Sequence, residues 1–496
     1  MSTVVTMRGV SFELPNGREL FQNIQLSLGD GLTALVGPNG AGKTTLAKLI
    51  QGELKPSAGQ IRREQATRFF AQREEPAAIS VGEYLSADYQ WSALGDALLE
   101  GIDHESPCTT LSGGQWMRVR LARVLDGDFL LLDEPTNDLD RAGREMILHF
   151  LRGRRGGALL ISHDREALAL CDEVLELSNL GLSAFGGGWT AYNEHKERER
   201  AALTRALHVA VRARDQAAVD RREQLRKQDK RNRRGADAAA RGGQAKILLG
   251  RKKRLAESST GKIDSASLER ANVAVRDTHE ALRALKTDAV MYADLMASPI
   301  AAQRRVAEAK DFNVYRGRWL YAQNLNFSWR GNVRVALQGN NGSGKSTLLS
   351  ALMGAELHTR GELRVGTLST LYIDQRCALL DNERSVIDNV QRASKLGESE
   401  IRNGLARFLF ANEAVFQKVA NLSGGERLRA ALACGFLATE KPDLLVLDEP
   451  TNNLDLVNIE FLESLVRAFK GALIVISHDD AFVDSCRIDR SLALGA

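Results

Sequence analysis

Cysteine is scarce in this sequence, and the few cysteines are not grouped. Five are spread over 496 residues, at Cys108, Cys171, Cys377, Cys434 and Cys486, and there is no CxxC motif. Because the number is odd and the spacing is wide, the pattern excludes a disulfide framework and a cysteine-rich zinc site. It indicates a protein of a reducing compartment.

Long apolar runs are also missing. The longest, such as FLLL and ALIVI, have about five residues, whereas a helix needs roughly 20 to cross a bilayer. The first residues, MSTVVTMRGVSFEL, lack a basic region followed by an apolar stretch, which argues against a signal peptide. We therefore expect a cytoplasmic protein with no membrane span, unless it binds a separate membrane subunit.

Charge is nearly balanced over the whole chain, with a net of +4, but it is not balanced along it. Residues 195–260 carry 20 Lys and Arg against 8 Asp and Glu, a net of +12, so the rest carries a net of −8. A basic middle between acidic flanks predicts a polyanionic partner for the middle alone. The segment 226–246 has no aromatic residue, and its basic residues are Arg226, Lys227, Lys230, Arg231, Arg233, Arg234, Arg241 and Lys246.

The chain contains an internal repeat, in which one module occurs twice. The paired segments are GPNGAGKTT and GNNGSGKST, LSGGQ and LSGGE, FLLLDEPTNDLD and LLVLDEPTNNLD, and ALLISHD and ALIVISHD. The offset between paired residues is nearly constant, at 302 from Lys43 to Lys345 and 315 from His163 to His478. In each module, short apolar runs without polar alternation precede the motifs, as is typical of strands buried on both faces of a mostly parallel sheet.

The composition changes between the modules, where Glu, Lys, Arg, Ala and Gln dominate. Residues 195–228 and 265–286 are two helix candidates, and we expect a helical hairpin with a basic tip between them. Gly235, Gly242 and Gly243 are the predicted breaks at the turn. The alternative is a solvated charged linker without a partner.

The motif GxxxxGK[ST] occurs in both modules and predicts two phosphate-binding loops. Its glycines let backbone N–H groups face phosphates, and the helix that follows adds its N-terminal dipole. Lys43 and Lys345 would reach the β and γ phosphates of a nucleotide, and the hydroxyls of Thr44 and Ser346 would coordinate Mg²⁺. The other candidate binding residues are Gly37, Asn39, Gly40, Gly42 and Thr45 in the first loop, and Gly339, Asn341, Gly342, Gly344 and Thr347 in the second.

An apolar strand that ends in Asp-Glu supplies the second half of each site. Asp133 and Asp448 would hold Mg²⁺ through water. Glu134 and Glu449 would orient and polarise the attacking water, as a general base within hydrogen-bond reach can do.

The combination of these motifs with LSGGQ and LSGGE resembles the ATP-binding cassette (ABC) ATPases, over both modules. In that family two cassettes face each other head to tail and sandwich two ATP molecules. The resemblance implies that each signature completes the site of the other cassette. Ser423, Gly424 and Gly425 would then face Lys43, and Ser112, Gly113 and Gly114 would face Lys345.

The same resemblance suggests further site residues. Gln72 and Gln375 match the glutamine that senses Mg²⁺ and the attacking water, and His163 and His478 match the histidine that contacts the γ-phosphate. Phe12 resembles the aromatic residue that stacks on adenine. Tyr315 is its expected counterpart, although either ring could instead pack on a strand.

Two fused cassettes with a charged helical linker resemble the ABC-F group, whose members act on ribosomes. The motifs DEPTNDLD and DEPTNNLD are close to that group's DEPTNHLD, and GGWTAYNEHKERER resembles the segment that leads into its linker. Packing at the helix start is the expected role of Trp189 and Tyr192 in that segment.

We therefore predict an α/β protein with two tandem ABC-type P-loop NTPase domains, 1–192 and 305–496, joined by a basic α-helical hairpin linker, 193–304. By resemblance it is a monomeric ATPase with intramolecular cassette pairing, which binds the tRNA exit region of the ribosome with its tip toward rRNA and peptidyl-tRNA. Its role would be translation control or protection against antibiotics. The alternatives are a soluble ATPase subunit of a transporter and a DNA-associated ATPase.

Overall fold

The structure is a computed structural model. It describes residues 3–15, 17–86, 93–125, 127–137, 139, 141–154, 156–178, 181–240, 273, 299–340, 342–410, 412–452 and 454–495. These residues fall into two compact units. One comprises Met1–Tyr192 together with Asp288–Ala496 and contains both cassettes, and the other comprises Asn193–Thr287.

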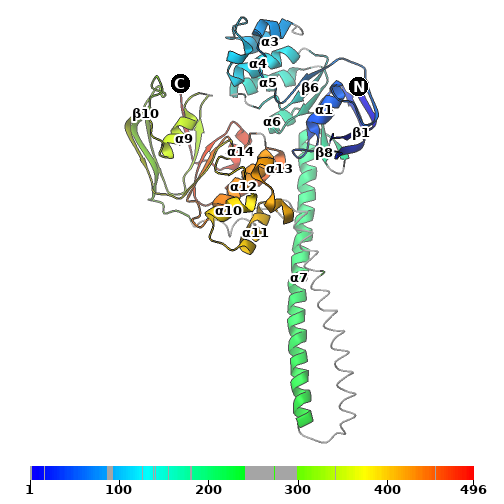
Figure 1. Cartoon of the computed structure of the whole chain (residues 1–496), viewed down its shortest axis with the longest axis vertical. Helices are drawn as coiled ribbons and strands as arrows, with labels where there is room; N and C mark the ends of the chain where they lie inside the picture. The colour runs from blue at the N-terminus through cyan, green and yellow to red at the C-terminus, as the bar shows by residue number, and fades with distance from the viewer. Residues whose placement is uncertain are drawn as a thin grey trace. The chain divides into compact units, whose positions relative to one another are not determined.

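A six-stranded sheet forms the centre of the first cassette (Figure 1). Its order is β5 (Thr67–Phe70), β6 (Phe129–Asp133), β7 (Ala158–Ile161), β3 (Leu32–Val36), β8 (Glu173–Ser178) and β9 (Gly181–Gly186). All neighbours are parallel except β8 and β9. Every residue of β6 and β7 is buried, which confirms the prediction of strands covered on both faces.

Two apolar cores cover this sheet. One contains Leu131 of β6 with α1 (Lys43–Gln51) and an antiparallel sheet in the order β2 (Glu19–Gly29), β1 (Thr3–Glu13) and β4 (Ala58–Arg63). The other contains Leu130 and Leu132 with the helices of the opposite layer. These helices are α2 (Val81–Ser86), α3 (Ala93–Leu99), α4 (Gly113–Val124), α5 (Arg141–Gly153) and α6 (Arg165–Leu168). Successive residues of β6 thus pack in opposite cores, because successive side chains of a strand point to opposite faces of the sheet.

The second cassette repeats this plan. Its parallel sheet has the order β14 (Thr370–Ile373), β15 (Leu444–Asp448), β16 (Ala472–Ile476), β12 (Arg334–Gln338) and β17 (Arg490–Ala493). Its antiparallel sheet has the order β11 (Leu325–Arg330), β10 (Arg305–Val314) and β13 (Thr359–Val365). The helices are α9 (Lys345–Leu352), α10 (Val386–Ala393), α11 (Glu398–Arg407), α12 (Gly424–Phe436), α13 (Leu456–Ala468) and α14 (Asp480–Ser485). The duplication predicted from the motifs is therefore present in the fold.

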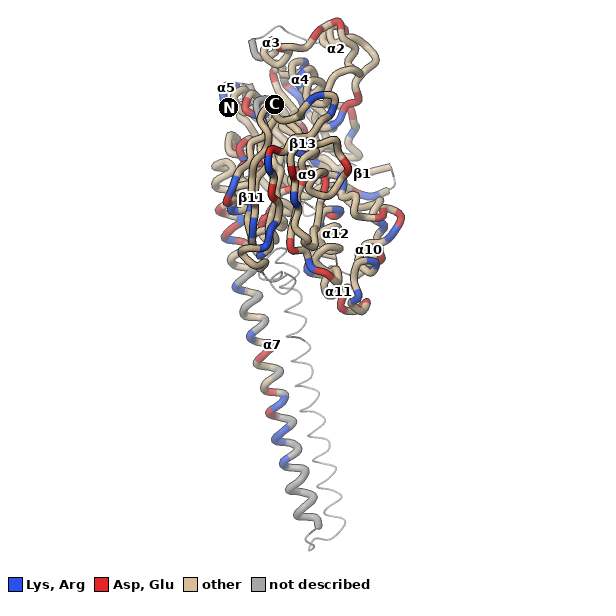
Figure 2. The backbone as a smooth tube through the Cα atoms, turned by 90° about the vertical axis from the view of Figure 1, so that its left-hand side faces the viewer, with Lys and Arg blue, Asp and Glu red and all other residues tan. Residues whose placement is uncertain are grey.

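Helix α7 (Gly188–Ala240) has 53 residues and carries Lys and Arg along its length (Figure 2). Trp189 and Tyr192, in its first turn, are buried in a core of the first cassette, with ring centroids 5.3 Å apart. This confirms the predicted packing role of these two rings. Exposed ion pairs one turn apart, such as Arg198 with Glu194 and Lys227 with Glu223, support the helix.

The prediction that Gly235 breaks the helix is wrong, because α7 continues to Ala240. A single glycine costs a helix only about 1 kcal/mol relative to alanine, and Ala236 and Ala238–Ala240 are strong helix formers that follow it. The predicted second arm, 265–286, lies almost entirely outside the described residues, as do Gly242 and Gly243.

The five cysteines are buried free thiols. Among the helices of the described residues, none is both long enough and apolar enough to cross a membrane.

Candidate active site

The first phosphate-binding loop follows β3 and ends where α1 begins. Gly42 caps α1 with φ 101°, and a Cβ there would lie 2.6 Å from Leu20 Cδ2, so both conformation and space require glycine. The Nζ atom of Lys43 donates to the carbonyls of Gly37 at 2.7 Å and Pro38 at 3.2 Å. This folds the ammonium group back over the loop, where it can meet phosphate oxygens.

The second loop repeats this geometry. Gly344 caps α9 with φ 90°, and Lys345 Nζ donates to the carbonyls of Gly339 at 2.7 Å and Asn340 at 3.2 Å. Asn341 lies outside the described residues. Both loops therefore offer a lysine and backbone N–H groups at a helix N-terminus, a combination that fits a nucleotide's phosphates.

A hydroxyl and a carboxylate meet next to each lysine. Thr44 Oγ1 donates to Asp133 Oδ2 at 2.6 Å. Burial raises the pKa of Asp133, and the bond from Thr44 opposes that rise. In the second cassette, burial raises the pKa of Asp448, opposed by the side-chain hydrogen bond with Ser346. Because these are oxygen donors of the kind that Mg²⁺ prefers, both pairs fit a magnesium site.

Each predicted general base follows its aspartate in a constrained backbone. Glu134 has φ 53° and Glu449 has φ 48°, a left-handed conformation that costs a residue with a Cβ about 1–3 kcal/mol and is found at functional sites. Their backbone N–H groups donate to Ile161 and Ile476, at the ends of β7 and β16. Each cassette's parallel sheet therefore holds its own glutamate at the carboxyl edge.

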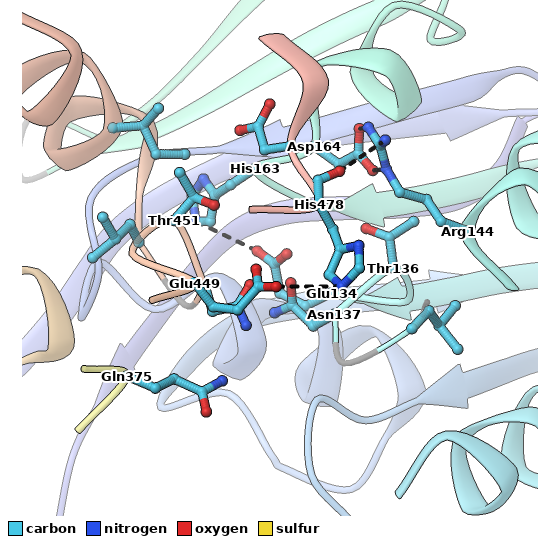
Figure 3. Close-up of a pocket in the computed structure, with 15 residues that line it drawn as sticks. Glu134, Thr136, Asn137, Arg144, His163, Asp164, Gln375, Glu449, Thr451 and His478 are labelled. Carbon is cyan, nitrogen blue, oxygen red and sulfur yellow. Dashed lines mark hydrogen bonds and ion pairs between the residues drawn. The ribbon is translucent and has the colours of Figure 1, made fainter. Parts of the chain in front are cut away.

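A histidine faces each of these glutamates (Figure 3). Nε2 of His163 lies 3.4 Å from Glu134 Oε1. Burial lowers the pKa of His163 to about 3, which leaves the imidazole neutral. Burial raises the pKa of Glu134 above its usual range, and it raises the pKa of Glu449 to about 7 against the pull of Lys345. At neutral pH such a carboxyl is poised to exchange a proton.

The two glutamines lie in different surroundings. Gln375 lines a pocket together with Glu134, Glu449 and both histidines (Figure 3). Gln72 lines a separate pocket beside Ser112, Gly113 and Gly114 of its own cassette. The structure thus brings Gln375, but not Gln72, into one pocket with Glu134 and Glu449, the two predicted general bases.

The signature serines begin helices. Ser112 caps α4 and accepts a bond from the Gln115 N–H at 3.3 Å, and Ser423 caps α12 in the same way with Glu426. The change from Gln to Glu therefore preserves the capping box. None of the hydrogen bonds among the described residues joins either serine to the opposite phosphate loop, so the pairing of signature and loop stays a prediction.

Contacts between the cassettes do occur near the sites. The backbone N–H of Asn39 donates to Asp455 Oδ2 at 2.9 Å, and Asp455 also caps α13. Arg144 donates to the carbonyl of His478, and Arg165 forms an ion pair with Glu463. The sequence interpretation included Asn39 and His478 as candidates, but it missed Asp455, Arg144, Arg165 and Glu463. Of the residues missed, only Asp455 could have been found from the sequence, because it is the last residue of the motif DEPTNNLD.

The aromatic candidates differ in burial. Phe12 is half-buried, with its ring centroid 6.3 Å from that of Phe21. Tyr315 is 42 % exposed and clusters with Trp319 and His358. Adding the loop offset of 302 to Phe12 leads to the buried Val314 rather than to Tyr315. The adenine-stacking assignment therefore stays a prediction, with Trp319 as an additional exposed ring.

The basic candidates on α7 are only partly described. Arg226, Lys227 and Lys230 are exposed. Arg231, Arg233 and Arg234 belong to α7, but their side chains lie outside the described residues, and so do Arg241 and Lys246 altogether.

Comparison with known proteins identifies the family of the two modules. A family profile described as "ABC transporter" matches residues 21–137 and 322–452. The ATP-binding protein Uup of Caulobacter vibrioides is 32% identical over 94% of this chain and 73% of its own length. The ribosome protection protein VmlR of Bacillus subtilis is 27% identical over 98% of this chain and 85% of its own.

Solved structures support the fold. An archaeal ribosome recycling factor, aABCE1, in complex with the stalk protein aP1, superposes with a TM-score of 0.62 at 18% identity, covering 98% of this chain and 87% of its own. The twin cassettes, their paired motifs and the relatives that match more than nine-tenths of this chain lead to one conclusion: the chain is an ATP-binding cassette ATPase and belongs to the ABC-F family.

Proposed function

We propose that this protein is an ATP-driven ribosome-binding factor. In the ATP-bound state its cassettes close and it occupies the tRNA exit region, with the basic segment toward rRNA and peptidyl-tRNA. Hydrolysis then releases it. Its effect would be to modulate translation or to protect the ribosome against antibiotics.

The chemistry proposed for each site uses the chain's own residues. The lysines and loop N–H groups bind the phosphates, and the Thr44–Asp133 and Ser346–Asp448 pairs would hold Mg²⁺. When bound, Mg²⁺ would neutralise charge on the β and γ phosphates. Glu134 and Glu449 accept a proton from the attacking water, and His163 and His478 lie beside these carboxylates. The opposite signature would complete each site.

The observation that carries the proposal is the basic helix that lies, in sequence, between two cassettes that each carry the ATPase motifs. Residues 188–240 contain 14 Lys and Arg against 8 Asp and Glu. A cationic helix binds phosphate backbones without reading sequence, and the absence of aromatic residues from 226–246 favours recognition of structured RNA over base stacking. The relationship to a ribosome protection protein supports ribosomal RNA as the polyanion.

The test traps the closed state. Glu134→Gln combined with Glu449→Gln should bind ATP without hydrolysing it, and the variant should co-sediment with ribosomes in ATP but not in ADP. A matched control adds Lys43→Ala and Lys345→Ala, which should abolish the association. If the trapped variant does not co-sediment with ribosomes, the proposal is wrong. Stronger retention on duplex or branched DNA would instead support a DNA-associated ATPase.

We also propose that the protein works as a cytoplasmic monomer whose cassettes, 1–192 and 305–496, pair within one chain. The contact from Asn39 to Asp455 supports that pairing. Light scattering of the trapped variant in ATP should give the mass of a single chain, and a mass of two chains would show that the cassettes pair between molecules.

A further inference from the structure

The two histidine loops meet at a polar junction, where Arg144 and Asp164 of the first cassette lie beside His478 of the second (Figure 3). Arg165 of the first cassette and Glu463 of the second also belong to this junction. Asp164 directly follows His163. Arg144, on α5, donates two hydrogen bonds to the Asp164 carboxylate, at 2.7 and 2.8 Å. Its remaining nitrogen donates to the backbone carbonyl of His478 at 3.4 Å. One guanidinium therefore contacts both loops.

A second contact crosses the junction beside the first. Arg165 Nη1 lies 2.7 Å from Glu463 Oε1, on α13. The Glu463 side chain is only 7% exposed, and those of Arg144 and Asp164 are 12% and 8% exposed. Buried charges of this kind are tolerated only when they are paired, so the junction fixes how these surfaces meet.

The pKa values of Asp164 and Asp479 also reflect the charges of the junction. Burial works to raise the pKa of Asp164, but the hydrogen bond and charge of Arg144 outweigh it and leave the pKa lowered. Burial raises the pKa of Asp479, and the charges of Arg165 and Arg144 oppose that rise across the junction. Across the junction, the arginines Arg144 and Arg165 of the first cassette thus face the carboxylates of Glu463 and Asp479 in the second.

The duplication does not repeat this junction. With the offset of 315 that relates the histidines, Arg144 corresponds to Ile459, Arg165 to Asp480 and Glu463 to Leu148. The second cassette therefore has no arginine at either position that could reach back toward the first.

We propose that Arg144 is a positioning residue shared by both ATP sites: it orders the His163 loop through Asp164 and the His478 loop through its backbone. Arg165 and Glu463 hold the two surfaces in register. Geometry of the His478 loop thus depends on an arginine of the first cassette, whereas Ile459, at the corresponding position of the second cassette, cannot donate such a bond to the His163 loop. The inference rests on the proposed function only for ATP hydrolysis, and its test needs no ribosome.

The test compares Asp164→Asn with the double variant Arg144→Ala/Asp164→Asn, which leaves no unpaired buried carboxylate. Hydrogen exchange of segment 474–482 should be about tenfold faster in the double variant than in the single one, because only the double variant loses the bond to His478. The kcat for ATP should fall about tenfold with KM changed less than twofold. Arg152→Ala, an exposed charge removed from the same helix, should change neither.

A charge swap tests the register. Arg165→Glu should speed exchange of 474–482, and adding Glu463→Arg should restore it. Asp480→Ala, at the position that corresponds to Arg165, should leave exchange of segment 158–166 unchanged. If removal of Arg144 leaves exchange of 474–482 unaltered, or if Asp480→Ala loosens 158–166, the proposed one-way positioning is wrong. Ribosome binding plays no part in these readouts, so its failure would not affect them.

Discussion

The Glu449 carboxylate lies 3.3 Å from Nε2 of His478, and the corresponding pair, Glu134 and His163, lies 3.4 Å apart. In each pair a carboxyl whose pKa is raised by burial faces an imidazole. The preserved distance means that the two cassettes keep the same acid–base arrangement, even though most of their other residues differ.

The raised pKa of Glu449 predicts the pH dependence of ATP turnover. A general base must be ionised, so kcat/KM should fall as the pH drops below about 7, approaching tenfold per pH unit. The measurement is kcat/KM from pH 5.5 to 8.5 in the Glu134→Gln variant, where the site with Glu449 is the intact one. A flat profile across that range would exclude Glu449 as the titrating base.

The same pKa predicts a stability change. Because the folded-state pKa of about 7 lies above the ordinary glutamate value of 4.5, the stabilisation from protonated Glu449 is complete below about pH 4.5 and is lost as pH rises through 7. Glu449→Gln should therefore raise the free energy of unfolding by about 2 kcal/mol more at pH 8 than at pH 5. Urea titrations at both pH values would measure this. Glu440→Gln, at an exposed position, should show no such difference.

Gly114 offers a direct test of the predicted pairing between a signature and the opposite phosphate loop. A Cβ at Gly114 would meet nothing within 4 Å, and alanine favours a helix start more than glycine does. Gly114→Ala should therefore keep the thermal unfolding midpoint, yet lower ATP turnover at least tenfold, because the added methyl would meet an incoming γ-phosphate.

Gly153→Ala is the control for Gly114→Ala, since its Cβ would also meet open space, at the end of α5. Unchanged turnover in Gly114→Ala would contradict the composite site. Gly425→Ala is a poor probe, because its Cβ would lie 2.1 Å from Asn458 Nδ2 and would disturb the packing itself.

The central sheets could be predicted from sequence because the signal is local. In β6 and β15 an unbroken apolar run stops at an Asp-Glu pair, so composition alone places the strand and its functional end. The left-handed φ of Glu134 and Glu449 was not predictable, since it arises from the bonds of their N–H groups to Ile161 and Ile476 on neighbouring strands.

Other features depend on contacts between distant residues. Arg144 belongs to no motif, and its partners lie 20 and 334 residues away in sequence. Gly235 was wrongly predicted to end the helix, because the alanines that follow it favour the helix and offset the free-energy cost of a single glycine. Tyr315 lies one residue beyond the position that the offset of 302 assigns to Phe12, so the repeat alone does not pair the two rings.

The exposed basic residues of α7 predict a salt-dependent interaction with RNA. In the Glu134→Gln/Glu449→Gln variant, replacing Arg226, Lys227 and Lys230 with Gln should weaken ribosome binding and lower the slope of log K against log salt by about 2. In the otherwise native chain, the same three replacements should leave basal ATP turnover unchanged. The matched control removes Lys196, Arg198 and Arg205, the same charge nearer the start of the helix. Because phosphate contacts act over short distances in salt, only the first triple should have the full effect. Equal effects of the two triples would show that the charge acts diffusely, without a defined contact near the end of α7.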